Sequence, residues 1–112
     1  MSVSFGGFNR ETATFRTTTE IEQGIPVTMR TNATVEPAAS GAAFCGIVDN
    51  CDGSYAAVQI YGEVTVAYEG TAPGVGYVKL GASNTGVKLS EAGREYLVLS
   101  VDEATSTVTF LM

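Results

Sequence analysis

Turn-forming residues interrupt this chain about every 8–12 residues, and that spacing limits the possible folds more than any other feature. The segments between them are short and rich in Val, Thr and Tyr, and several alternate between apolar and polar positions as half-buried strands do. No segment has the apolar spacing of a helix longer than one turn. The sequence therefore predicts an all-β chain, folded as a small single-domain β-barrel or sandwich with an extended N-terminal arm.

Most of the predicted strands lie in the last three quarters of the chain. One apolar run without alternation, residues 42–48, is predicted to be a buried strand. The Asp, Asn and Gly residues of 49–53 are then predicted to form a hairpin turn, and residues 32–35 to extend an earlier strand. The other predicted strands are 25–30, 54–61, 63–69, 77–80, 87–89, 96–101 and 107–111.

Residues 1–23 have weak hydrophobic order and are predicted to be the N-terminal arm, with one strand around residues 12–17. The β-barrel or sandwich domain is then expected to span residues 24–112. The arm contains Phe5, Phe8 and Phe15 but no apolar pattern that would make a core for them. Such side chains are expected to anchor against another surface, and both the chain's own barrel and a partner protein remain open.

Charge is distributed unevenly along the chain. Twelve acidic residues face six basic ones, so the formal net charge is −6. Residues 1–35 are neutral overall, with Arg10, Arg16 and Arg30 against three Glu, and the rest carries the whole net charge. An acidic chain argues against nucleic acid as a partner, because that binding needs clustered Lys and Arg. We expect the acidic part to face solvent and the neutral part to contact a partner.

Histidine is absent, and this excludes Ser-His-Asp and Cys-His catalysis by this chain alone, as well as zinc sites built on imidazole. Glu63 and Glu69 would lie roughly 20 Å apart on one strand, too far for a glycosidase pair. We therefore expect no enzyme activity, no cofactor and no metal site. Tyr55, Tyr61, Tyr68 and Tyr77 leave open a small carbohydrate- or ligand-binding module.

Two further features bear on the compartment. Cys45 and Cys51 are either two free thiols or a disulfide across the predicted hairpin turn, and the spacing allows both. The N-terminal residues lack the basic and apolar regions of a secretory signal, and no apolar run approaches the roughly 20 residues of a membrane span. We expect synthesis in a cytoplasm and no membrane partner.

Three segments of the chain resemble a known family: 43–48 (AFCGIV), 55–66 (YAAVQIYGEVTV) and 68–76 (YEGTAPGVG). They look like the head decoration proteins of tailed bacteriophages, also called capsid cement proteins. In that family an F-x-G-(I/V)-V strand precedes a strand ending Q-x-x-G-x-V-x-V, and a Y-x-G-x-x-P-x-x-G segment follows. Residues 96–102 and 107–111 also look like the end of the family's pattern. The resemblance covers residues 42–112 and leaves the arm outside it.

The resemblance implies a structural virion protein without catalytic residues, made in the bacterial host cytoplasm and located on the outer surface of the capsid. The implied partner is the major capsid protein, with self-association as a dimer or trimer left open. An alternative is another small phage component, from the tail, the connector or the base of a head fibre. The residues expected to contact the capsid are Phe5, Phe8, Arg10, Phe15, Arg16 and Arg30.

Overall fold

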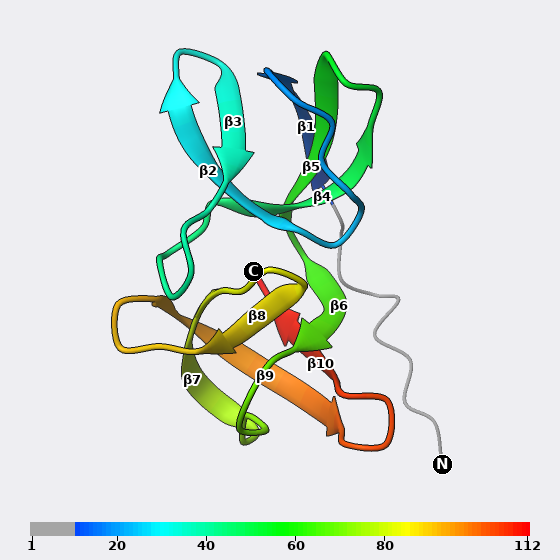
Figure 1. Ribbon diagram of the computed structural model, residues 1–112. Coiled ribbons are helices and arrows are strands. Elements are labelled where there is room, and N and C mark those ends of the chain that lie inside the picture. The colour runs from blue at the N-terminus through cyan, green and yellow to red at the C-terminus, as the bar shows by residue number, and fades with distance from the viewer. Residues whose placement is uncertain (1–10) are drawn as a thin grey trace.

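A computed structural model describes residues 11–112, and in that range the chain forms ten strands and no helix (Figure 1). The prediction of an all-β chain is confirmed. Within these residues no helix is long and apolar enough to span a bilayer. The strands are β1 Glu11–Thr17, β2 Pro26–Thr31, β3 Thr34–Pro37, β4 Gly46–Cys51, β5 Tyr55–Tyr61, β6 Glu63–Tyr68, β7 Gly76–Ala82, β8 Gly86–Leu89, β9 Arg94–Asp102 and β10 Thr107–Leu111.

The strands close into two small barrels, where the sequence suggested one barrel or sandwich. The first has the strand order β1-β3-β2-β4-β5 and the second β10-β6-β8-β7-β9. Gly62 separates them, with a φ of 96° that a residue bearing a Cβ rarely adopts. The chain therefore changes direction between β5 and β6, and each half closes on itself (Figure 1).

The two barrels have the same topology. In each, the first and third strands are parallel neighbours, and every other neighbouring pair is antiparallel. Matching positions have matching roles: Val35 of β3 and Val87 of β8 are both fully buried. The carboxylates of Asp52 and Asp102 each accept two backbone N–H groups in the turn before the last strand of their barrel. The second half of the chain is thus a structural repeat of the first.

Each barrel has its own apolar core, but the second core also takes side chains from the first half of the chain. Phe44 and Ile47 are buried among the residues of the second barrel. The ring of Phe44 stacks on Tyr96 with centroids 5.3 Å apart, and the Tyr96 hydroxyl donates to the Phe44 carbonyl at 3.2 Å. The first core consists of Ile21, Val27, Val35, Val48, Ala56 and Val58.

This packing corrects the strand predicted at residues 42–48. Strand β4 begins at Gly46 and continues to Cys51, while residues 42–45 belong to the segment that crosses from β3 to the second barrel. The run is apolar because tertiary packing buries it, which sequence periodicity cannot distinguish from a buried strand. The turn predicted at 49–53 is correspondingly shorter, because Asp49 and Asn50 lie at a register shift within β4.

Two further boundaries differ from the prediction. Residues 32–35 do not extend the preceding strand, because the chain reverses at Ala33, whose φ is 54°, and β3 starts at Thr34. The strand expected around residues 12–17 is present as β1, between β3 and β5. The boundary predicted between residues 23 and 24 therefore falls inside the first barrel.

Candidate functional site

Exposed apolar and positively charged side chains gather at the end of the first barrel that points away from the second. Arg16 of β1 lies between Tyr55 of β5 and Thr34 of β3 in the strand register. Met29 and Arg30 lie at the same end on β2, next to the β2–β3 turn (Figure 1). We call Arg16, Met29, Arg30 and Tyr55 the distal surface.

The distal surface combines exposed apolar area with two guanidinium groups. Met29 is 45% exposed and Tyr55 51% exposed. Arg30 is held in place by one hydrogen bond, from Nη1 to Thr18 Oγ1 at 3.0 Å. A guanidinium carries five N–H donors, so most of the donors of Arg30 stay available to a carboxylate. Aromatic residues, Met and Arg are the types enriched in protein–protein interfaces.

The structure brings two of the predicted contact residues together and assigns a third to the core. Arg16 and Arg30 are both exposed and both belong to the distal surface. Phe15 is half-buried and packs against the core of the first barrel, so the chain's own barrel anchors this side chain. Phe5, Phe8 and Arg10 lie outside the described residues.

The four tyrosines considered as a ligand face do not share one. Tyr55 is part of the distal surface, and Tyr61 lies at the end of β5 beside the junction of the barrels. Tyr68 packs against the core of the second barrel. Tyr77 is exposed on β7 of that barrel, opposite Leu97. The strands thus separate the side chains that a carbohydrate platform would need on one surface.

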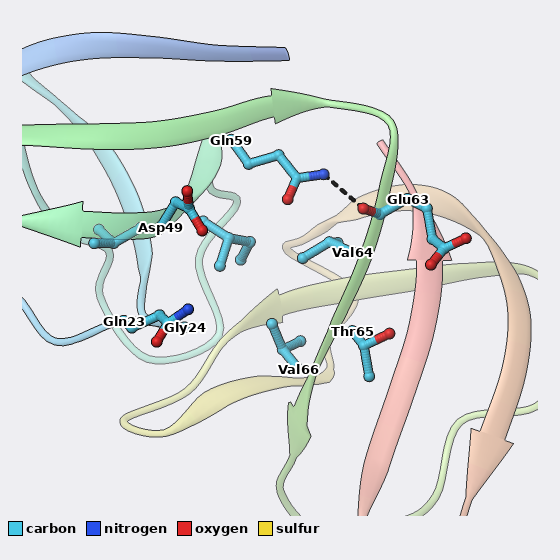
Figure 2. Close-up of a pocket in the computed structure, with 10 residues that line it drawn as sticks. Gln23, Gly24, Asp49, Gln59, Glu63, Val64, Thr65 and Val66 are labelled. Carbon is cyan, nitrogen blue, oxygen red and sulfur yellow. Dashed lines mark hydrogen bonds between the residues drawn. The ribbon is translucent and has the colours of Figure 1, made fainter. Parts of the chain in front are cut away.

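A pocket of about 230 Å³ lies at the junction of the barrels, between β4 and β5 of the first and β6 of the second (Figure 2). Gln59 lines it and is almost fully buried. Its Nε2 donates to the carbonyl oxygens of Tyr61 at 3.2 Å and Glu63 at 2.6 Å, on either side of Gly62. Gln59 therefore holds the connection between the barrels in one conformation.

The chemistry of this pocket does not single out a ligand. Asp49, Glu63 and Thr65 are among the polar residues that line it. Among residues 11–112 no group of three His, Cys, Asp or Glu is placed to hold a metal ion. The role of Gln59 was not predicted from the sequence, although a polar residue between Val58 and Ile60 was the available signal.

Both cysteines are free thiols, so the disulfide alternative does not hold in this structure. Burial raises the pKa of the Cys45 thiol above its ordinary value. The sulfur of Cys51 accepts backbone N–H groups from Ile21 at 3.4 Å and Gly53 at 3.5 Å. Each thiol is thus packed among the residues of its own segment.

Comparison with known proteins adds no assignment: no protein family model matches the chain, and no curated protein is significantly similar to it. The function is therefore inferred from the residues and their arrangement.

Proposed function

We propose that this protein is a structural component of a phage virion that binds the outer surface of the capsid lattice and stabilises the head. The observation that carries the proposal is the distal surface: Arg16, Arg30, Met29 and Tyr55 are exposed together at one end of a two-barrel body. The resemblance of residues 42–112 to capsid decoration proteins supports it independently. The major capsid protein is the partner that this resemblance implies.

The union of the two barrels suits a protein that reinforces a shell. Phe44 from the first half is buried in the second barrel, and Gln59 bridges the connection between them. A body whose parts are already fixed loses little conformational entropy when it binds. A protein that binds only the assembled shell stabilises it by mass action, because disassembly requires its release.

The distribution of charge gives the two ends different characters. Residues 11–61 contain six acids and two Arg, and residues 63–112 contain six acids and three bases. Acidity is therefore shared by both barrels rather than belonging to one region, while Arg16 and Arg30 lie together at the distal end. In the proposed orientation the distal surface faces the shell, and the second barrel projects into solvent, where its net negative charge keeps particles apart.

Removing the two distal charges tests the proposal. In co-sedimentation with purified shells that lack this protein, we expect the R16A/R30A double variant to bind about tenfold more weakly or worse, because each lost charged hydrogen bond costs about 1.5–3 kcal/mol. The matched control is K79A/K88A, which removes two positive charges from the second barrel and should bind normally. Equal losses in both variants, or no shell binding by the wild-type protein, would contradict the proposal.

The predicted role of the arm needs a deletion that respects the fold. Removing residues 1–20 would delete β1 and open the first barrel. A deletion of residues 1–10 removes Phe5, Phe8 and Arg10 and leaves all ten described strands. If these residues contact the capsid, the deletion weakens co-sedimentation; unchanged binding would remove them from the interface and leave the distal surface as the contact.

A further inference from the structure

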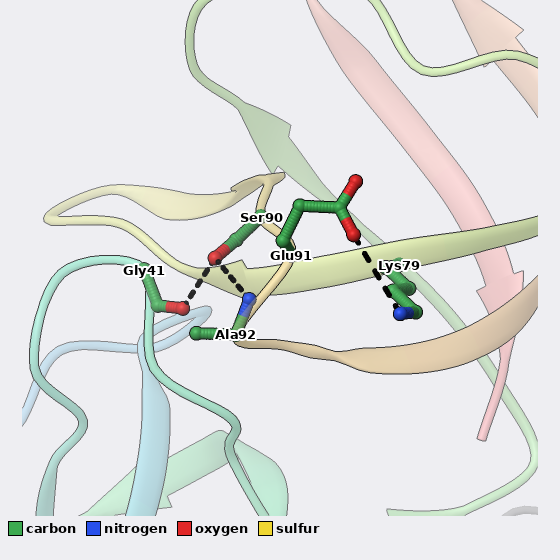
Figure 3. Close-up of polar contacts among 5 residues, drawn as sticks. All are labelled: Gly41, Lys79, Ser90, Glu91 and Ala92. Atoms are coloured by element: carbon green, nitrogen blue, oxygen red, sulfur yellow. Dashed lines mark hydrogen bonds and ion pairs between the residues drawn. The ribbon is translucent and has the colours of Figure 1, made fainter.

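One strand edge of the second barrel is covered by a segment of the first half of the chain. The N–H of Gly41 donates to the carbonyl of Ala82 at 2.8 Å, and the N–H of Ala82 donates to the carbonyl of Ala42 at 2.9 Å. The hydroxyl of Ser90 donates to the carbonyl of Gly41 at 2.6 Å and fixes this segment from the other side (Figure 3). The backbone N–H and C=O of Ala82 at the edge of β7 are therefore both bonded to the β3–β4 connection.

Met29 is the counterpart of Ala82 in the first barrel. Met29 of β2 pairs with Val35 of β3, and Ala82 of β7 pairs with Val87 of β8, in the same register. The N–H of Ala38 donates to the carbonyl of Pro26, so alternate residues of β2 bond to β3. The backbone N–H and C=O of Met29 consequently point away from β3, as those of Ala82 point away from β8.

Within the described residues, no strand pairs with β2 on this side at Met29. Strand β4 pairs only with Pro26 and Val27 of β2, and the last bond on this side runs from the Cys45 N–H to the Val27 carbonyl. In the second barrel the edge is covered by the long β3–β4 connection of the first. The corresponding β8–β9 connection, residues 90–93, is short and remains beside β7, where the N–H of Ser90 donates to the Lys79 carbonyl.

We propose that the edge of β2 at Met29 binds an extended, acidic segment of the shell subunit by strand addition. An open edge offers one N–H donor and one C=O acceptor to an incoming backbone, which is the recognition mode of β-augmentation. The internal precedent at Ala82 shows that the backbone groups at the same position of this barrel fold bond to another segment. This inference rests on the proposed function only for the source of the segment, which is the shell.

Charge selects this occupant over two others. Arg30 directly follows Met29 in β2, so a carboxylate on the incoming segment is favoured. A second copy pairing through the same edge would bring the Arg30 residues of the two copies together. Residues 1–10 of the chain contain Arg10 and no Asp or Glu, so they lack the complementary charge.

A proline at position 29 tests the edge directly. Met29→Pro removes the N–H that the incoming strand would use, and proline is tolerated in an edge strand when that N–H faces outward. We expect this variant to keep its melting temperature and to bind shells about fivefold to tenfold more weakly in co-sedimentation. Met29→Ala keeps the N–H and shortens the side chain, so it measures the contribution of the side chain alone, and Met29→Pro should bind more weakly than Met29→Ala.

Ala82→Pro is the matched control at the covered edge. Its N–H is already bonded to Ala42, so this substitution should lower the melting temperature, where Met29→Pro does not. Amide hydrogen exchange on the wild-type protein supplies a readout that needs no variant: the Met29 amide should exchange rapidly in the free protein and be protected on the shell.

The outcomes separate this inference from the proposed function. Shell binding by the wild-type protein together with full binding by Met29→Pro, or with an unprotected Met29 amide, overturns the strand addition alone. Absence of wild-type binding overturns both. Loss of binding in Met29→Pro with protection of the amide in the wild type supports both.

Discussion

At the scale of single residues, Tyr96 is one of the side chains that join the two barrels. Its ring lies 5.3 Å from that of Phe44 and 5.1 Å from that of Phe110, and the Arg94 guanidinium lies 5.6 Å from its centroid. Its hydroxyl is the donor to the Phe44 carbonyl. The residue thus combines stacking with a directed hydrogen bond that crosses between the two halves of the chain.

Tyr96→Phe removes the hydroxyl and keeps the ring. We expect the free energy of unfolding to fall by about 1–2 kcal/mol at neutral pH, because the buried Phe44 carbonyl loses its donor. Urea denaturation followed by circular dichroism measures the change. A loss above about 3 kcal/mol would show that the ring packing had also been disturbed.

Two titratable side chains that are at least partly buried, one in each half of the chain, predict that the folded protein is less stable at alkaline pH. Burial raises the pKa of the Cys45 thiol above its ordinary 9.0 and that of Tyr96 above its ordinary 10.0. The folded chain therefore keeps these protons at a pH where the unfolded chain releases them. Stability is complete below about pH 9 and declines as the pH rises through both raised values. The decline above about pH 10 should be less steep in Tyr96→Phe; identical curves would contradict it.

Single residues were predictable where a local rule applied. Arg16 and Arg30 stay predicted contact residues, and the structure adds that both are exposed in the distal surface. Phe15 was chosen because the arm has aromatic side chains but no apolar pattern, yet its alternating position on β1 turns it against the core. Gln59 was missed, because its role depends on the turn at Gly62 and on the carbonyl groups that the turn presents.

At the scale of elements, the close approach of the β3–β4 connection to β7 depends on a glycine. A Cβ at Gly81 would lie 2.5 Å from the carbonyl oxygen of Gly41. This approach allows Gly41 and Ala42 to complete the edge of β7. The glycine is therefore required for packing between the barrels rather than for a turn.

Gly81→Ala should lower the free energy of unfolding by about 1–3 kcal/mol, because the connection has to move off β7. Gly74→Ala is the matched control, since a Cβ there meets no atom within 4 Å. Thermal denaturation of both variants checks the prediction. Equal melting temperatures would mean that the connection does not press on β7 at this point.

Most strands lie close to their predicted ranges. Strands β5, β6 and β10 lie close to their expected ranges because Gly62 and the residues around Asp52 and Asp102 mark their ends. Residues 42–45 were misassigned as strand, because Phe44 is buried by a neighbouring barrel whose existence the local pattern does not reveal.

At the scale of the whole molecule, the repeat of one five-strand topology was not predicted. Matched core positions share apolar character rather than identity, as Val27 with Leu80 and Val58 with Phe110 show. Such a repeat is visible in the strand pairing and hardly in the sequence. It places the same edge twice in one chain, covered by the chain itself in one barrel and open in the other.

The orientation of the molecule on a shell follows from this arrangement. The distal surface and the open edge of β2 lie at the same end of the first barrel, and the second barrel lies at the other (Figure 1). Binding through that end would leave Tyr77 of β7 exposed on the particle.

A cryo-electron microscopy reconstruction of the complete virion tests this central claim most directly. The account predicts density for the two barrels on the outside of the capsid, with Arg16, Met29, Arg30 and Tyr55 against the shell and the second barrel projecting outward. Absence of the protein from the outer surface, or contact with the shell through the second barrel, would contradict it.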